Sequence, residues 1–383
     1  SRASYRTYPA HGFAKPQEGE VPWCNTRVPD CLSAVRAQPQ AYAALVAPYG
    51  KLWQRVADLA QYELLQVPNE LVFTYKIPYT AWQQAMTAHA VALAQSPSAE
   101  HVRAMCQQVD TTRRLAKHDG RTMSFHGVDV EATRHGLQML AQLLNENPAL
   151  APTDWADCRA ALAADAQWPQ QVCHMARSEV RWTAASMRDS LGGSFGAGFH
   201  GAVLQGLMWL GVGGDRLVTQ ALSELASDAC TPSHAQALSA GHLPEPLQRS
   251  AWQQVLLVVR APVAVAMGMM DAPDYSEPTR LVADAEALRA MGRSWLWWRE
   301  QLAREGSSGP LAQAMVQGDV ARLNALLGAR PAEVQLPGHP LTVVRGEQGL
   351  VLRLVMWRGI RERVDGEWGE RERLVDVVLP RLH

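Results

Sequence analysis

Four of the six cysteines restrict what this chain can fold into more than any other feature of its sequence. Cys24 and Cys31 flank a short loop that contains proline, and Cys158 and Cys173 bracket a stretch that we expect to form a helical hairpin. Two such local pairs predict two disulfides, which persist in oxidising compartments and are rare in the cytosol. The sequence therefore predicts a disulfide-bonded protein of an extracytoplasmic compartment.

Cys106 and Cys230 remain after these local pairs. They form either a long-range bridge, which would tie the early helices to the late ones, or two buried thiols, which behave as small apolar side chains. Closing a short loop such as 24–31 stabilises a fold by about 2–3 kcal/mol in the chain-entropy description. We therefore expect the cysteines to have a structural role.

The length and composition indicate a globular protein with a large core, because 47% of its 383 residues are hydrophobic. The 36 basic and 37 acidic side chains leave a formal net charge of -1. So small a charge provides no field that would gather phosphate backbones or an anionic membrane surface. The composition therefore argues against nucleic acid as a partner.

The N-terminal end predicts that a segment precedes this chain. The sequence begins Ser1-Arg2-Ala3-Ser4, without an initiator methionine and without an apolar signal segment. We expect a cleaved signal or a membrane anchor before it, and we expect contact with the membrane only through that missing N-terminal anchor. Residues 255–270 are strongly apolar, but Arg260 and Pro262 interrupt them, which favours a buried core helix over a membrane span.

The spacing of apolar residues predicts a mainly α fold, an irregular multi-helix bundle with a small C-terminal β-hairpin appendage. We divide the chain into an extended lead-in with a local disulfide over residues 1–38, a helical domain over 39–330, and a small β-containing segment over 331–383. The expected helical segments are 40–64, the segment from Ser96-Pro97 to Gly120, 128–145, 154–164, 170–190, 203–210, 216–229 and 247–270, with further helix starts at Thr231-Pro232 and Ser276-Pro278.

The C-terminal segment changes from helical to alternating periodicity. Apolar and polar residues alternate from Leu341 to Met356 around Gly346-Glu347-Gln348-Gly349, which predicts a β-hairpin. Residues 375–379 predict a further strand. Residues 358–373 are densely charged and contain glycines, and their acidic residues balance their arginines. We therefore expect a solvated loop there and not a surface for an acidic partner.

One pattern matches the nucleophile elbow of serine hydrolases. Gly192-Gly193-Ser194-Phe195-Gly196 has the G-x-S-x-G spacing, in which glycines allow the sharp turn that exposes the serine. That elbow follows a buried strand, whereas residues 180–191 have helical periodicity, so we expect a helix-to-helix connection and keep catalysis by Ser194 as the alternative. The triad partners under this alternative are His200 or His234 as the base and Asp189, Asp215 or Asp228 as the orienting carboxylate.

Cofactor and metal patterns are weak in this sequence. Residues 196–201 match G-x-G-x-x-G, but no expected strand precedes them and no acidic residue closes a second strand at the spacing of a dinucleotide fold. The sequence contains no H-E-x-x-H and no C-x-x-C, and Cys173-His174 with Glu179 makes only a partial zinc ligand set. His126 and His135 lie on either side of an expected helix start. We therefore predict no cofactor and no metal site.

A tryptophan-rich segment is the first candidate for a binding surface. Consecutive positions point in different directions around a helix. We therefore expect Trp295 and Trp298 to pack on a core face while Trp297 points outward, and we keep an exposed, partner-binding tryptophan as the alternative. The connection at 192–201 is the second candidate. Together the binding candidates are Trp295, Trp297, Trp298, Arg299, Phe195 and Phe199.

Two short stretches carry a resemblance to known proteins. They are Pro273-Asp274-Tyr275-Ser276 with the following Leu281, Asp284, Leu288 and Arg289, and the Leu336-Pro337-Gly338-His339-Pro340-Leu341 turn before the hairpin. This order resembles a group of uncharacterised, membrane-anchored, mainly helical periplasmic proteins of Gram-negative bacteria, and the likeness covers about a third of the chain. The resemblance implies an N-terminal anchor followed by a periplasmic helical body, and it implies no chemistry.

We therefore expect a non-catalytic periplasmic protein, anchored in the inner membrane in its full-length form. Its expected role is that of a scaffold, accessory or inhibitor-type subunit, which presents a helical surface or groove to a protein partner in the cell envelope. Besides the serine hydrolase, a second alternative is a carrier of an apolar ligand between helices. The apolar stretches 202–212 and 255–270 suggest that alternative.

Overall fold

The protein is mainly α-helical with a small antiparallel sheet near its C-terminus, as predicted. A computed structural model describes residues 21–24, 28, 30–62, 79–117, 123–151, 155–178, 229–244, 276–347, 349–364 and 367–380. The helices are α1 (Cys31–Ala37), α2 (Pro39–Val46), α3 (Gly50–Asp58), α4 (Tyr79–Gln95), α5 (Ala99–Lys117), α6 (Met123–Glu146), α7 (Ala156–Leu162), α11 (Pro232–Ser239), α14 (Ser276–Glu305), α15 (Pro310–Gln317) and α16 (Val320–Gly328). The strands are β1 (Leu341–Gly346), β2 (Gly349–Val355), β3 (Ile360–Val364), β4 (Glu367–Arg371) and β5 (Leu374–Val378).

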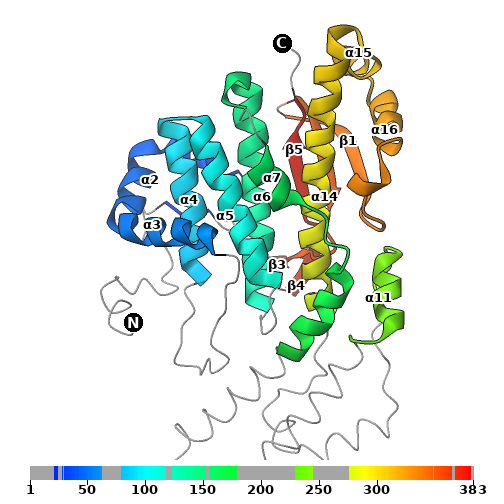
Figure 1. Ribbon diagram of the computed structural model, residues 1–383, viewed down its shortest axis with the longest axis horizontal. Coiled ribbons are helices and arrows are strands. Elements are labelled where there is room, and N and C mark those ends of the chain that lie inside the picture. Colours follow the sequence, from blue (N-terminus) through cyan, green and yellow to red (C-terminus); the bar gives the residue numbers. More distant parts are fainter. Residues whose placement is uncertain are drawn as a thin grey trace, which may run out of the picture.

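The helices and strands form two sides that meet in the middle of the molecule (Figure 1). Helices α2 to α5 lie on one side, and α14, α15 and α16 lie with the strands on the other. Between them, α6 packs against α4 and α5 on one side and against α14 and β5 on the other. Buried apolar residues of α2, α4, α5, α6, α14, α15, α16, β1, β2 and β5 belong to one continuous hydrophobic core. Val56 of α3 belongs to a second, smaller cluster, which includes Leu115 and Phe125.

Helix α1 shows that helical structure begins inside the segment that we expected to be an extended lead-in. The Asp30 carboxylate caps this helix, accepting hydrogen bonds from the Ser33 backbone N–H (3.0 Å) and the Ser33 hydroxyl (2.7 Å). Leu32 and Val35 are fully buried. The helix is 7 residues long, which is too short for its apolar spacing to stand out in the sequence.

The single helix predicted over 40–64 is wrong. The chain forms α2, the 3-10 turn η2 (Ala47–Tyr49), α3 and the 3-10 turn η3 (Leu59–Gln61) in succession. Pro48 lacks a backbone N–H and Gly50 has a low helix propensity, so the backbone breaks here although the apolar spacing continues. The Trp53 indole Nε1 donates to the Val46 carbonyl (3.2 Å) across this break.

The predicted helices from 96 to 164 correspond to α5, α6 and α7, and residues 168–178 are helical as predicted. The cap of α5 is Ser98 and not Ser96, since the Ser98 hydroxyl accepts a hydrogen bond from the His101 N–H (3.1 Å). Glycine permits a close helix contact: a Cβ on Gly136 of α6 would lie 2.8 Å from the Val109 Cγ2 of α5. The predicted segments 179–190, 203–210 and 247–270, and 216–228 of the segment at 216–229, lie outside the described residues.

Helices α11 and α14 begin where the sequence predicts. Thr231 caps α11, accepting a hydrogen bond from the His234 N–H (3.2 Å), and Pro232 occupies its first turn. Helix α14 begins at Ser276 and is 30 residues long. The chain then continues through η5 (Gly306–Ser308), α15, α16 and η6 (Ala332–Val334) into the strands, while η4 (Pro148–Leu150) follows α6.

Strands β1, β2 and β5 form the three-stranded sheet, in the order β1-β2-β5. The predicted hairpin and the predicted third strand are therefore confirmed. The antiparallel register pairs Val343 with Leu352 and Leu352 with Val377, so alternate side chains form one apolar face. The buried residues of this face are Leu341, Val343, Leu352, Leu354, Val375 and Val377. On the opposite face, Arg353 donates two hydrogen bonds to the Asp376 carboxylate (2.7 and 2.6 Å) and forms an ion pair with it.

Helix side chains occupy both edges of this sheet. Asn324 of α16 accepts a hydrogen bond from the Val343 N–H of β1 (2.7 Å) and donates one to the Val343 carbonyl (2.9 Å). At the other edge, the Trp295 indole of α14 donates to the Val378 carbonyl of β5 (2.9 Å). These contacts satisfy backbone groups that would otherwise be open to pairing with another strand.

The solvated loop predicted over 358–373 is wrong. Strands β3 and β4 form an antiparallel hairpin there, with Ile360 opposite Arg371 and Val364 opposite Glu367. Strand pairing needs only backbone groups, so a densely charged sequence without apolar alternation conceals it. Arg373, which follows the hairpin, is buried.

The predicted disulfide between Cys24 and Cys31 is present, and both cysteines are buried. The structure has three disulfides and no free cysteine. Disulfides of this number indicate an oxidising, extracytoplasmic compartment. Among the helices of the described ranges, none combines the length and the apolar composition that crossing a membrane requires.

The other predicted cysteine pairs are wrong. Cys158 bonds to Cys106 and Cys173 bonds to Cys230, so neither a local 158–173 bridge nor a 106–230 bridge forms, and no free thiols remain. Helices α5 and α7 pack side by side, which brings the Cα atoms of Cys106 and Cys158 to 4.8 Å. Local spacing in the sequence does not reveal which helices are neighbours.

Candidate functional site

A network of buried charges joins α6 to α14. The Arg289 guanidinium of α14 donates to the Asp129 carboxylate of α6 (2.7 Å) and to Glu286 one turn earlier on its own helix (3.0 Å). Arg293 contacts the other oxygen of Glu286 (3.0 Å) and donates to the Leu162 carbonyl of α7 (2.8 Å). The network therefore fixes the positions of three helices relative to one another.

The charges of this network stabilise one another against burial. Burial opposes the charge of Arg289, but the carboxylates of Asp129 and Glu286 outweigh that effect and raise the pKa of Arg289. Burial lowers the pKa of Arg293, which Glu286 only partly offsets. Asp129, Glu286 and Arg289 are each 1% exposed. Because these groups are buried and paired, the network is a closed structural element and not an open reactive site.

A second buried cluster joins α6 to the residue that precedes β5. Glu131 accepts hydrogen bonds from Arg134 (2.8 and 3.1 Å) and from Arg373 (2.5 Å). Burial alone would raise the pKa of the Glu131 carboxyl, but the two guanidinium groups outweigh it and lower that pKa. The cluster therefore ties the C-terminal strands to the central helix by charge.

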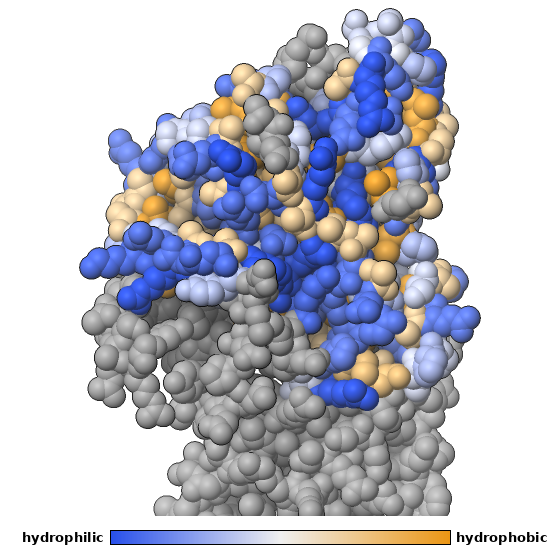
Figure 2. All heavy atoms as spheres, in the orientation of Figure 1, coloured by the Kyte–Doolittle hydropathy of each residue, from blue (hydrophilic) through white to orange (hydrophobic). Residues whose placement is uncertain are grey.

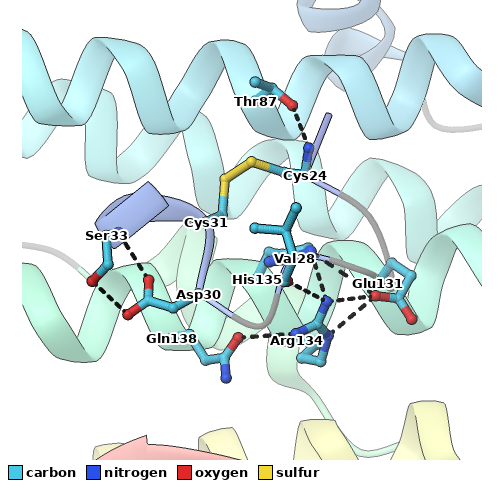
Figure 3. Close-up of a disulfide and its surroundings, with 10 residues drawn as sticks. All are labelled: Cys24, Val28, Asp30, Cys31, Ser33, Thr87, Glu131, Arg134, His135 and Gln138. Carbon is cyan, nitrogen blue, oxygen red and sulfur yellow. Dashed lines mark hydrogen bonds and ion pairs between the residues drawn. A yellow bond between two sulfur atoms is a disulfide. The ribbon is translucent and has the colours of Figure 1, made fainter. Parts of the chain in front are cut away.

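The Cys24–Cys31 bridge and Val28 lie next to this second cluster (Figure 3). Val28 lies between the Cys24–Cys31 bridge and Arg134, and its carbonyl accepts a hydrogen bond from the Arg134 guanidinium (3.3 Å). On the other side of the bridge, the Cys24 N–H donates to the Thr87 hydroxyl of α4 (2.9 Å). The loop therefore spans from α4 to α6 and completes the surroundings of Arg134.

Two histidines of α6 lie inside these clusters. His126 is 2% exposed, and burial lowers its pKa to about 4; Asp129 opposes this shift and Arg289 adds to it. His135 is fully buried, with its Nε2 2.8 Å from Arg134 and 3.9 Å from Glu131. The sequence shows His126 and His135 only as scattered histidines, because local spacing does not reveal that both are buried or that Arg289 lies close enough to act on His126.

An open cleft lies between η3, α5 and α7. It has a volume of about 390 Å³, within the range of small-ligand sites. Its lining residues are Ala57, Asp58, Ala60, Gln61, Gln107, Asp110, Arg114, Asp157 and Ala160. Three carboxylates and one guanidinium make this lining acidic, and the Arg114 Nε is already paired with Asp110 (2.9 Å). The cleft is therefore suited to a positively charged group.

Arg114 shapes the cleft. Its guanidinium donates to the Ala60 carbonyl (3.1 Å) and to the Tyr62 carbonyl at the end of η3, and to the Thr111 hydroxyl (3.2 Å). The carbonyls at the end of a helical turn have no partner within the turn, so Arg114 both satisfies them and holds η3 against α5. No pattern in the sequence marks this residue as important.

The predicted tryptophan surface is only partly correct. Trp295 and Trp298 are 1% and 0% exposed, so these two binding candidates are core residues, as the packing interpretation expected. Trp297 is half-buried and packs edge-on against Trp298, with ring centroids 6.3 Å apart. The Arg299 guanidinium lies 5.2 Å from the centre of the Trp295 ring. An exposed tryptophan platform is therefore absent from this segment of α14.

The candidate catalytic residues lie outside the described residues, with the exception of His234. Ser194, His200 and Asp189 lie outside the described residues, as do the alternative carboxylates Asp215 and Asp228 and the binding candidates Phe195 and Phe199. His234 is described, and it lies in the first turn of α11. The serine hydrolase alternative therefore stays a prediction.

Comparison of the chain with protein-family models, curated proteins and solved structures gives no match. The candidate site is therefore defined by geometry: an acidic cleft on a helical body whose interior is tied by disulfides and ion pairs. Within the described core, the space among Met105, Val109, Leu140 and their neighbours is about 10 Å³, which is too small for a ligand.

Proposed function

We propose that this chain is a non-catalytic binding or scaffold protein of the cell envelope, located in the periplasm and tethered to the inner membrane by an N-terminal anchor. The observation that carries this proposal is the combination of three disulfides with buried ion pairs, which hold the helices in fixed positions. The resemblance to anchored periplasmic proteins supports the location. Its two stretches meet in the fold, where Asp284 lies 3.7 Å from His339.

We place the contact region at the cleft between η3, α5 and α7. On the face seen in Figure 2, hydrophilic residues predominate and apolar residues form small separate groups, which favours recognition through charge. Asp58 is exposed at the rim of the cleft, and Asp157 is half-buried inside it. The proposed partner is therefore a protein of the cell envelope that inserts a lysine or arginine side chain among these carboxylates.

Site-specific photo-cross-linking in living cells tests this contact region. A photoreactive residue at Ala57 or at Gln61, which are both exposed and line the cleft, is expected to give a cross-linked product with one partner. The same residue at Val316 on α15, 75% exposed and on the other side of the molecule (Figure 1), is the control and is expected to give none. Equal products at all three positions would contradict the proposal.

A charge reversal distinguishes recognition from chance proximity. Asp58→Lys places a cation at the rim of the cleft and is expected to reduce the cross-linked product at Ala57 by about tenfold. Glu347→Lys is the matched control, because Glu347 is exposed in the turn between β1 and β2, away from the cleft. If both variants leave the product unchanged, the cleft does not bind through charge.

A fluorophosphonate probe separates this proposal from the hydrolase alternative. A binding protein is expected to stay unlabelled, whereas a serine hydrolase would react through its activated serine. Labelling that disappears in Ser194→Ala would replace the proposal with the alternative.

A further inference from the structure

The turn at 336–340 holds a histidine in an unusual environment. His339 is 2% exposed, and its ring stacks on the Trp357 indole with centroids 4.2 Å apart and planes 29° apart. The Trp357 Nε1 donates to the Gly338 carbonyl of the same turn (3.2 Å). The turn therefore depends on Trp357 for both stacking and a hydrogen bond.

A buried carboxylate of α14 faces this histidine. Asp284 is 0% exposed and accepts hydrogen bonds from the Trp357 N–H (2.7 Å) and the Arg358 N–H (2.9 Å). Its Oδ1 lies 3.7 Å from the Nε2 of His339. Within the described structure, neither ring nitrogen of His339 has a hydrogen-bond partner. A buried polar group without a partner is costly, and it calls for a physical explanation.

We propose that His339 and Asp284 form a latch controlled by protonation, in which a cationic His339 fastens the turn at 336–340 to α14 and a neutral His339 releases it. The imidazolium would gain a charge-assisted hydrogen bond to the carboxylate after a movement of less than about 1 Å. The imidazolium would also be stabilised by a cation–π interaction with the Trp357 ring on which it stacks. A neutral ring carries no positive charge, so a hydrogen bond from its Nε2–H to Asp284 would be weaker than that of the imidazolium, and the attraction to the Trp357 ring face would be lost.

The groups around His339 come from three elements. The carboxylate of Asp284 faces it from α14, and the indole of Trp357, followed by Arg358, faces it from the connection between β2 and β3. The segment after α11 contributes backbone to the same turn, at Gly241. In this arrangement Asp284 supplies the negative charge that attracts a protonated His339.

The latch also determines how firmly the segment at 229–244 is held. Gly241 (φ 81°) and Gly338 (φ 78°) approach each other so closely that a Cβ on Gly241 would lie 2.2 Å from the Gly338 nitrogen. This contact joins the segment to the turn, and the Cys173–Cys230 disulfide is its covalent tie. Release of the turn is therefore expected to loosen the segment while the disulfide keeps it attached. The inference concerns regulation of the fold and does not rest on the proposed function.

Amide hydrogen exchange of the full chain, followed from pH 8 to pH 5.5 and corrected for intrinsic exchange rates, tests the latch. The opening equilibrium of the amides at 336–342, where every residue except the two prolines has an N–H, is expected to fall about tenfold as the pH falls in the wild type. His339→Phe keeps an aromatic ring on Trp357 but cannot take up a proton, so its opening equilibrium is expected to stay constant. His242→Phe, at an exposed histidine beside Gly241, is the control and is expected to behave like the wild type. A wild type that follows His339→Phe at every pH overturns the proposal.

Imidazole NMR of the wild type gives a second, independent test that needs no variant. The latch requires the His339 ring to be cationic in the folded protein at pH 5.5 and neutral at pH 8. Ring carbon and nitrogen shifts that move between these limits support it, and this measurement remains decisive even where His339→Phe does not fold. A ring that stays neutral throughout this range overturns it.

Discussion

The helical side of the molecule, α1 to α7, and the C-terminal side, α14 to β5, share one apolar core but hold their elements together differently. The helical side carries the Cys24–Cys31 and Cys106–Cys158 disulfides. The C-terminal side contains no cysteine, and its sheet is held by strand register and by side chains such as Asn324 that bond to its edges. The helical side is therefore held by covalent bridges, and the C-terminal side is held by hydrogen bonds.

The comparison shows that helix packing and strand pairing need different interactions to hold their elements in place. No ladder of backbone hydrogen bonds joins one helix to another, and here covalent bridges tie the helices, whereas strands are positioned by a regular ladder of backbone hydrogen bonds. Neither a disulfide nor a strand ladder joins α6 to α14, where the two sides meet. Buried charges join α6 to α14 and to Arg373 instead. We infer that these charges specify how the two sides pair, a role that buried ion pairs have in some other proteins.

Loss of the central ion pair is expected to have the largest effect on stability. Arg289→Met leaves the Asp129 and Glu286 carboxylates buried without their main cation, which is expected to lower the free energy of unfolding by about 3–5 kcal/mol. Arg304→Met is the control on the same helix, because its pair with Glu300 is exposed, and it is expected to cost less than about 0.5 kcal/mol. Denaturant unfolding measures both, and equal losses would show that burial of the network contributes nothing.

Removal of disulfides is expected to reveal the effect of loop length. The Cys106–Cys158 bridge spans a sequence separation of 52 and the Cys24–Cys31 bridge one of 7. In the chain-entropy description, replacing the first pair by alanine costs about 4 kcal/mol and replacing the second about 2 kcal/mol. Thermal and denaturant unfolding of the two double variants check this order. A larger loss for the short loop would mean that its contacts with Arg134 matter more than chain entropy.

Acid is expected to destabilise the protein through His126. The unfolded chain takes up this proton near the ordinary pKa of 6.5, whereas burial keeps the folded pKa at about 4. Between these two values the unfolded state binds more protons, so the contribution is fully present above about pH 6.5 and is lost as the pH falls toward 4. The loss for this buried group is up to about 3 kcal/mol.

Variants assign this pH dependence to a residue. His126→Asn is expected to flatten the fall in the free energy of unfolding between pH 6.5 and pH 4, while the exposed His174→Asn leaves it unchanged. Part of the fall remains in His126→Asn, because burial and the neighbouring His101 also lower the pKa of His89 to about 4. An identical pH profile for His126→Asn and the wild type would show that His126 has no part in it.

Much of the fold could be predicted because it follows from local periodicity. The hairpin of β1 and β2 and the starts of α11 and α14 follow from alternation, proline and capping residues within a few positions of one another. The charged hairpin of β3 and β4 could not be predicted, since its sequence has no apolar alternation. The break at Pro48 was hidden because the apolar spacing continues across it.

The buried clusters and the cleft could not be predicted because their members are distant in the chain. Glu131 and Arg373 are 242 residues apart, and nothing near either residue marks the other as its partner. Arg373 was assigned to a solvated loop because arginine is mostly exposed, and only the carboxylate from α6 explains its burial. The cysteine pairs failed for the same reason, since Cys106 and Cys158 are neighbours only after α5 and α7 have packed.

The smallest effect is expected at the edge of the sheet. Asn324→Ala removes the side chain that pairs with both the N–H and the carbonyl of Val343. Those two groups then depend on water or stay without partners, which is expected to cost about 1–2 kcal/mol and to speed exchange of the Val343 amide. Arg322→Ala, at an exposed position of the same helix, is the control and is expected to change neither the stability nor the exchange of the Val343 amide.

Because an open edge can pair with a second chain, Asn324→Ala is also expected to increase association at high concentration, measured by light scattering. A variant that stays as stable and as monodisperse as Arg322→Ala would show that strand register alone holds the C-terminal side.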